Sequence, residues 1–234
     1  LQRRDFLKQA AALTGAVGAA MEARAQPAAP QPAAPQPVAP FNGYLFFGPA
    51  EAAFVEALVN VMCPADQYTP NGVDCGLATF FDRQLAGAFG QGKGRYQRGP
   101  WKQGPPQMGL QSPLTPAQMF SAGVRAANAA SSAAHGGSFD QLPMERADAF
   151  LQDIAAGKVL AEEISLAEWF NALVYPLFLQ ACFADPMYGG NYDKVFWKML
   201  GYPGLPATHA QDIVRYRGKP YPGAHTPKSM LDFS

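Results

Sequence analysis

The chain has 234 residues, of which 48% are hydrophobic and 12% aromatic, which is enough to bury the core of one ordinary domain. Its formal net charge is +0, so composition gives no support for binding to nucleic acid or to an anionic membrane surface. No apolar run approaches the roughly 20 residues of a membrane-spanning helix.

The first residues resemble a twin-arginine export signal. Gln2 stands where that signal usually has Ser or Thr, whereas Arg3, Arg4 and the later Phe-Leu-Lys fit it. A mildly apolar stretch follows, and residues 23–25 have the small-x-small form of a signal-peptidase site. The alternative is a plain amphipathic N-terminal helix. We expect residues 1–25 to be a twin-arginine signal peptide, which directs an already folded protein to the periplasm.

A Pro/Ala-rich segment follows the signal. Residues 26–40 read QPAAPQPAAPQPVAP and carry no charge. Such a sequence favours extended polyproline geometry and cannot bury a core, so it is expected to be a semi-rigid linker. The globular domain is therefore expected to cover residues 41–234.

Apolar residues repeat at helical spacing in several segments of this domain. The expected helices cover residues 49–62, 76–85, 115–134, 143–156, 165–183 and 192–200. Thr115 and Pro116 begin a capping box, and a Gly-Gly pair at 136–137 should end that helix. Pro176 lies inside the fifth segment and should kink or divide it.

Two long stretches rich in Gly and Pro separate or follow these helices. Residues 87–112 are expected to be loop, and residues 202–234 are expected to be tail. No segment has the convincing alternation of a strand. The predicted fold class is all-α, an irregular helical domain with long Gly/Pro-rich loops and an extended C-terminal tail.

The residue types that carry chemistry are few. In an oxidising periplasm Cys63 and Cys75 are candidates for a disulfide, and two separate buried thiols are the alternative. Cys182 lies in an apolar helical run and is expected to be a small buried hydrophobe. The chain has no Cys-x-x-Cys-His sequence for a c-type haem. Metal-ligand spacing is also missing around the three histidines, His135, His209 and His225.

Basic and aromatic side chains gather in the first long loop: Lys93, Arg95, Tyr96, Arg98, Trp101 and Lys102. A solvent-exposed loop is one interpretation of this segment. The other is a docking arm, because Arg, Tyr and Trp often anchor protein interfaces. An export signal for folded cargo without a visible cofactor site suggests a chain that folds onto a cofactor-bearing partner.

An unusual sequence near the C-terminus carries a family resemblance. Residues 185–191 read DPMYGGN, and they are followed by Trp197 and by GYPG at 201–204. This pattern resembles the gluconate 2-dehydrogenase subunit 3 family, in which a His often stands at the position of Asp185. The likeness covers nearly all of residues 46–204.

The resemblance implies a periplasmic, membrane-associated heterotrimer that oxidises a sugar or sugar acid. In such a complex the large subunit carries FAD, and a multihaem cytochrome c subunit carries haem c and passes electrons to the membrane. The small subunit carries the export signal and stabilises the flavoprotein. The resemblance implies no catalytic, cofactor-binding or metal-binding residue in this chain, and it implies contact with the membrane only through the complex.

Partner contacts are expected at eight residues: Tyr96, Arg98, Trp101, Tyr188, Gly189, Gly190, Asn191 and Tyr202. The Gly-Gly pair should also form a backbone turn forbidden to other residues, and the Asn should cap the following helix.

Two other functions stay open. One is a stand-alone periplasmic enzyme. The second is a carbohydrate-binding protein that uses Trp101, Trp169 and Trp197, although the last two are at helical spacing and fit a core better.

Overall fold

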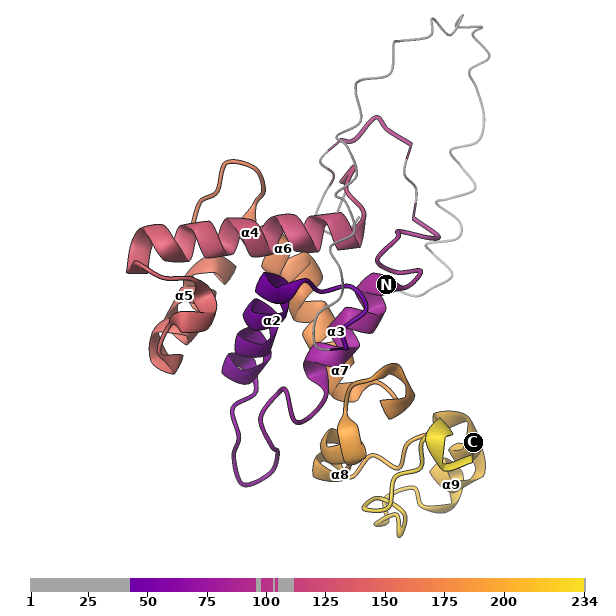
Figure 1. The fold of residues 1–234 in the computed structure, drawn as a ribbon. Coiled ribbons are helices and arrows are strands. Elements are labelled where there is room, and N and C mark those ends of the chain that lie inside the picture. Colours follow the sequence, from indigo (N-terminus) through magenta and orange to yellow (C-terminus); the bar gives the residue numbers. More distant parts are fainter. Residues whose placement is uncertain (1–42, 96–97, 103, 105–111, 234) are drawn as a thin grey trace, which may run out of the picture. The chain divides into compact units, whose positions relative to one another are not determined.

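The computed structural model describes residues 43–95, 98–102, 104 and 112–233, all within the unit Gln36–Ser234 (Figure 1). The expected signal peptide at 1–25 and linker at 26–40 lie outside the described residues. The described part of the chain is built of helices joined by turns and contains no strand, which confirms the all-α class.

All six expected helical segments are present, with ends that differ by a few residues at most. The α-helices are α2 Pro49–Met62, α3 Leu77–Ala86, α4 Pro116–His135, α5 Met144–Ala155, α6 Leu166–Trp169, α7 Tyr175–Phe183, α8 Val195–Leu200 and α9 Ala210–Arg215. Short 3₁₀ turns connect or follow them: η3 Phe139–Gln141, η5 Pro186–Tyr188, η6 Tyr192–Lys194, η7 Pro206–His209 and η8 Met230–Phe233. The C-terminal segment that was expected to be plain tail therefore contains α9 and two of these turns.

The ends of α4 follow from its local sequence. The N–H of Gln118 donates to the Thr115 hydroxyl over 3.3 Å, and the N–H of Thr115 donates to the Gln118 side-chain oxygen over 2.9 Å. This reciprocal pair satisfies two helix-end donors. Gly136 ends the helix with φ at 79°, a left-handed conformation that favours glycine. The predicted capping box and stop are confirmed.

The expected interruption at Pro176 takes the form of a π-helical segment. Residues Phe170–Val174 join α6 to α7 as a wide turn, closed by a bond from the Tyr175 N–H to the Phe170 carbonyl. Proline has no N–H and its ring crowds the preceding helical turn, so a widened turn accommodates it. The helical run therefore continues past Pro176 instead of ending there.

Large aromatic side chains fill the core. Phe120 of α4 lies between Phe47, at 5.8 Å, and Trp169 of α6, at 6.2 Å between ring centroids. Helix α4 approaches α6 closely because residue 123 is glycine, and a Cβ there would collide with the Trp169 indole. Trp169 and Trp197 are both buried, and Trp169 belongs to the main core cluster.

A buried carboxylate fixes the segment that leads into α2. The backbone N–H groups of Leu45, Phe46 and Phe47 donate to the two oxygens of Asp82 over 2.7, 2.8 and 3.1 Å. Asp82 lies on α3 and is 2% exposed. Since α3 also packs against α7, this clamp connects the beginning of the domain to the helix that leads into the DPMYGGN sequence.

Candidate functional site

The DPMYGGN sequence, residues 185–191, forms a compact turn after α7, and we call it the Gly-Gly turn. Asp185 precedes η5 and accepts a hydrogen bond from the Met187 N–H over 3.0 Å. Gly189 has φ at 100°, which favours glycine. Gly190 lies so close to α7 that a Cβ would collide with the Ala181 carbonyl. Both glycines are therefore required by the fold, as the sequence predicts.

Asn191 joins the end of α7 to the beginning of α8. Its side chain is fully buried; Nδ2 donates to the Ala184 carbonyl over 3.2 Å, and Oδ1 accepts from the Phe196 N–H over 3.0 Å. Phe196 is the second residue of α8, and its N–H is one of the helix-end donors that have no partner within the helix. Asn191 thus caps α8 through its side chain, although Lys194 and not Asn191 is the residue directly before that helix.

The residue that follows the Gly-Gly turn is bonded to the segment before α3. The Tyr192 N–H donates to the Cys75 carbonyl over 3.0 Å. Gly76 has φ at 77°, and a Cβ there would lie 2.6 Å from the Gly189 carbonyl oxygen. The turn is consequently packed on two sides, by α7 and by the N-terminal end of α3.

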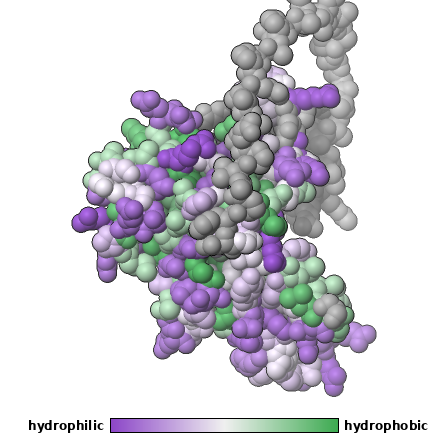
Figure 2. All heavy atoms as spheres, viewed as in Figure 1, coloured by the Kyte–Doolittle hydropathy of each residue, from purple (hydrophilic) through white to green (hydrophobic). Residues whose placement is uncertain are grey.

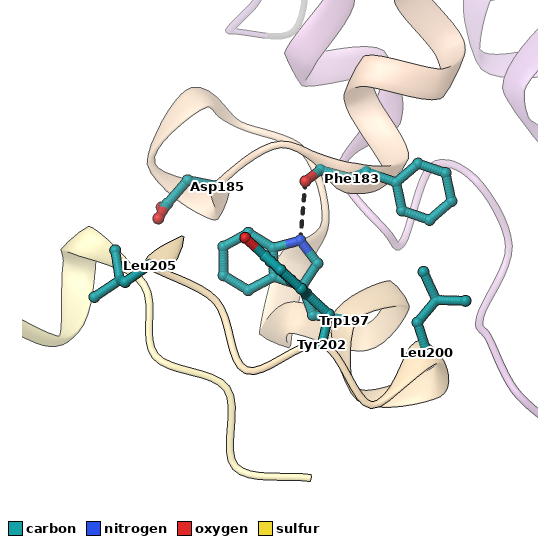
Figure 3. Close-up of a pocket in the computed structure, with 6 residues that line it drawn as sticks. All are labelled: Phe183, Asp185, Trp197, Leu200, Tyr202 and Leu205. Atoms are coloured by element: carbon teal, nitrogen blue, oxygen red, sulfur yellow. Dashed lines mark hydrogen bonds between the residues drawn. The ribbon is translucent and has the colours of Figure 1, made fainter. Parts of the chain in front are cut away.

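An apolar hollow of about 450 Å³ lies beside this turn (Figure 3). It is lined by Phe183, Asp185, Trp197, Leu200, Tyr202 and Leu205. Figure 3 shows Phe183 and Leu200 on one side of the Trp197 indole and Asp185 and Leu205 on the other. The indole Nε1 donates to the Phe183 carbonyl over 2.9 Å, and the Tyr202 ring meets the indole edge-on at 5.3 Å. This bond leaves the indole without a free donor for a ligand.

Asp185 is the one charged side chain in this lining. Its Oδ1 accepts from the Met187 N–H, and its Oδ2 accepts from the Met230 N–H, each over 3.0 Å. Both carboxylate oxygens therefore already accept hydrogen bonds from the chain itself. An acid–base or ligand-binding role would compete with these two bonds.

A second hollow, of about 520 Å³, adjoins the first across Phe183. Its lining comes from α3, α7 and the Gly-Gly turn: Phe80, Gln84, Leu179, Gln180, Phe183, Ala184 and Tyr188. Leu179, Phe183 and Tyr188 are 39%, 43% and 50% exposed, so large apolar surface is open to solvent here. On the face shown in Figure 2, hydrophobic side chains likewise reach the surface among hydrophilic ones.

The C-terminal segment is bonded to the same region. The Lys228 N–H donates to the Pro203 carbonyl over 2.9 Å, and Lys194 forms a salt bridge of 2.7 Å with Asp232. Gly204 packs so closely under this segment that a Cβ would collide with the Lys228 carbonyl. We call residues 226–233 the C-terminal strap.

The sequence-predicted contact residues differ in where they lie. Tyr188 and Tyr202 line the hollows, whereas Gly189, Gly190 and Asn191 are buried and shape the turn beneath Tyr188. Arg98 is exposed and Trp101 is partly exposed, and neither is among the residues that line the two hollows. Tyr96 lies outside the described residues.

Sequence reasoning missed the exposed side of α7. Tyr175, Leu179 and Phe183 follow one another at four-residue spacing and are 45%, 39% and 43% exposed. The spacing is visible in the sequence. Gln180 is the one strongly polar side chain of α7, however, so the pattern alone marks the exposed side only weakly.

The structure records Cys63, Cys75 and Cys182 as buried free thiols. The Sγ atoms of Cys63 and Cys75 lie 3.8 and 3.4 Å from the same carbonyl oxygen, that of Pro70. Burial raises the pKa of the Cys75 and Cys182 thiols to about 12. The Cys63–Cys75 disulfide stays a prediction.

Within the described ranges, no cluster of His, Cys, Asp and Glu has the geometry to hold a metal ion. The described helices also include none with the length and hydropathy needed to cross a bilayer.

The family model described as Gluconate 2-dehydrogenase subunit 3 matches residues 49–204, about two thirds of the chain. This range begins with α2 and ends at the GYPG sequence, so it contains the Gly-Gly turn and all but Leu205 of the hollow linings. No match was found among curated proteins or among solved structures.

Proposed function

Because the chain belongs to the gluconate 2-dehydrogenase subunit 3 family, we propose that it is the non-catalytic small subunit of an FAD-dependent sugar or sugar-acid dehydrogenase. Its role in this proposal is to stabilise the flavoprotein subunit and to be exported together with it. The observation that carries the proposal is the family match across the helical domain and the Gly-Gly turn.

The chemistry of the site supports a structural role over a catalytic one. Two polar side chains of the Gly-Gly turn are engaged within the chain: the Asp185 carboxylate accepts backbone N–H groups, and the Asn191 amide bridges two helices. What the region offers to a partner is apolar surface and shape. Such surface suits a permanent protein contact, because obligate interfaces are more apolar than transient ones.

In this proposal the cofactors are bound by the other subunits. FAD would be bound by the large subunit, and haem c by a multihaem cytochrome subunit that passes electrons to the membrane. A twin-arginine signal at residues 1–25 would carry the folded pair of subunits to the periplasm, after which the complex would associate with the inner membrane. The Cys63–Cys75 disulfide would form there.

Co-expression tests this proposal. The flavoprotein encoded next to this chain is produced in a bacterium with an active twin-arginine system, with the full chain, without it, or with Arg3→Lys and Arg4→Lys together. We expect periplasmic, flavin-loaded enzyme only with the unaltered chain, and cytoplasmic flavoprotein in the other two cases. Equal export and equal flavin content without this chain would refute the proposed function.

A further inference from the structure

We infer that the flavoprotein subunit docks on the exposed side of α7 and the two hollows beside it. We call this surface the apolar face, and its exposed anchors are Tyr175, Leu179, Phe183, Tyr188 and Leu200. The inference rests on the proposed function, since it names where the proposed partner binds.

The apolar face is one surface built from three neighbouring elements. Tyr175, Leu179 and Phe183 lie along α7 at four-residue spacing, which places them on one side of the helix. Tyr188 shares a hollow with Leu179 and Phe183, and Leu200 shares the other hollow with Phe183. Contiguous apolar surface of this kind is costly to leave in water and is typical of an interaction site.

The hollows give this face sockets for a partner's side chains. Phe183 stands between a hollow of about 450 Å³ and one of about 520 Å³, so the two lie side by side along the face. Interfaces gain most of their binding energy from a few aromatic or apolar anchors in desolvated pockets. The turn beneath the hollows is held by the buried Asn191 and the close-packed Gly190, so little ordering cost remains for binding.

The polar groups of the face favour a polypeptide over a lipid bilayer. Neither hollow has a Lys or Arg in its lining, and the carboxylate of Asp185 is already bonded to two backbone N–H groups. Binding to an anionic lipid surface depends on basic side chains beside the apolar ones. The lining instead contains the neutral amides of Gln84 and Gln180, which offer donors and acceptors that suit a protein backbone.

The family match selects the partner. Its description is that of a third subunit of a dehydrogenase, so chains of this kind work beside other subunits. The apolar face is built almost wholly from residues inside the matched range. A second copy of this chain is the competing occupant, and the experiment below distinguishes the two.

The test places a charge on the apolar face. Phe183→Asp and Leu179→Asp are introduced singly into the full, tagged chain, which is co-expressed with the flavoprotein. The matched control is Leu160→Asp, because Leu160 is 86% exposed and lines neither hollow. The readout is flavin absorbance recovered per mole of tagged chain. We expect a loss of about tenfold or more for the two α7 variants, the scale of an interface hot spot, and none for the control.

The outcomes distinguish a failure of the proposed function from a failure of the proposed docking location. Failure of the unaltered chain to recover flavoprotein overturns the proposed function. Suppose that the unaltered chain and both α7 variants recover the flavoprotein equally, and that the variants unfold at the same temperature as the control. This result overturns only the location of the interface. The free chain could also elute as a dimer that Phe183→Asp converts to a monomer, with no effect on flavoprotein recovery. This result assigns the apolar face to a second copy of the chain and also overturns the inference.

Discussion

The Asp82 clamp gives the sharpest test of how this fold is held together. Replacing Asp82 by Ala removes the acceptor for the backbone N–H groups of Leu45, Phe46 and Phe47. Phe47 is fully buried, so its N–H has no access to water, whereas Leu45 is 65% exposed and its N–H is readily rehydrated. Losing a charged acceptor costs about 1.5–3 kcal/mol per bond, and a rehydrated donor costs less.

These terms give an expected loss of about 3–5 kcal/mol in the free energy of unfolding, with the largest single share from Phe47. This is a large share of the roughly 5–15 kcal/mol that stabilises a typical domain. Asp82→Asn keeps the shape and one acceptor oxygen but turns an NH₂ group toward the remaining donors. We therefore expect its stability to fall between those of the unaltered chain and the Ala variant.

Urea unfolding followed by tryptophan fluorescence, to which the buried Trp169 and Trp197 contribute, measures these differences. The control is Asp153→Ala, which removes an exposed salt bridge to Lys158 and should change the free energy of unfolding by less than about 1 kcal/mol. A change below about 1 kcal/mol for Asp82→Ala would show that water or another group replaces the carboxylate, and the clamp argument would be wrong.

Three further predictions concern the Gly-Gly turn, the strap and the thiols. Gly190→Ala should destabilise the domain by about 1–3 kcal/mol in thermal unfolding, because its Cβ meets a backbone carbonyl of α7, and an unchanged melting temperature would contradict this. The hydrogen bond from Lys194 lowers the pKa of Asp232. The salt bridge should therefore hold the strap in place when the pH is above the ordinary carboxyl pKa of about 3.9, and it should release the strap as the pH falls through the lowered pKa. Hydrogen exchange in the strap, corrected for intrinsic rates, should rise at acid pH, and Lys194→Met should weaken that dependence, since the Ser229 N–H still donates to Asp232. Oxidised glutathione should join Cys63 to Cys75, which leaves one thiol that can be alkylated and raises the free energy of unfolding by about 3 kcal/mol. Three alkylatable thiols after oxidation would exclude the disulfide.

The helices were predictable where the deciding interactions are local. The capping box of Thr115 and the left-handed Gly136 each act within four residues, so the sequence shows both ends of α4 directly. The Asp82 clamp joins residues 35 to 37 positions apart, and no local pattern marks it. Helix α9 was missed because its six residues carry too few apolar positions to show a helical period.

The candidate site was predictable in part for the same reason. The Gly-Gly pair and Asn191 indicate a turn because few residues accept their backbone geometry, and φ values of 100° at Gly189 and 51° at Asn191 agree with that. The hollows beside the turn depend on side chains from separate segments, such as Phe183 and Leu205, which meet only after folding. Sequence spacing therefore locates the turn but not the surface that it supports.

The C-terminal strap extends the site past the end of the family match. The matched range ends at Gly204, whose missing side chain leaves room for the Lys228 carbonyl on one side and the Trp197 ring on the other. Leu205, the next residue, completes the lining of the first hollow, and the strap's Met230 N–H binds the second oxygen of Asp185. Without the strap, the second carboxylate oxygen of Asp185 would lack this hydrogen bond, and a partly buried charge with fewer partners costs free energy. The segment after the family match thus supplies a hydrogen bond to the one charged side chain in the lining of the first hollow.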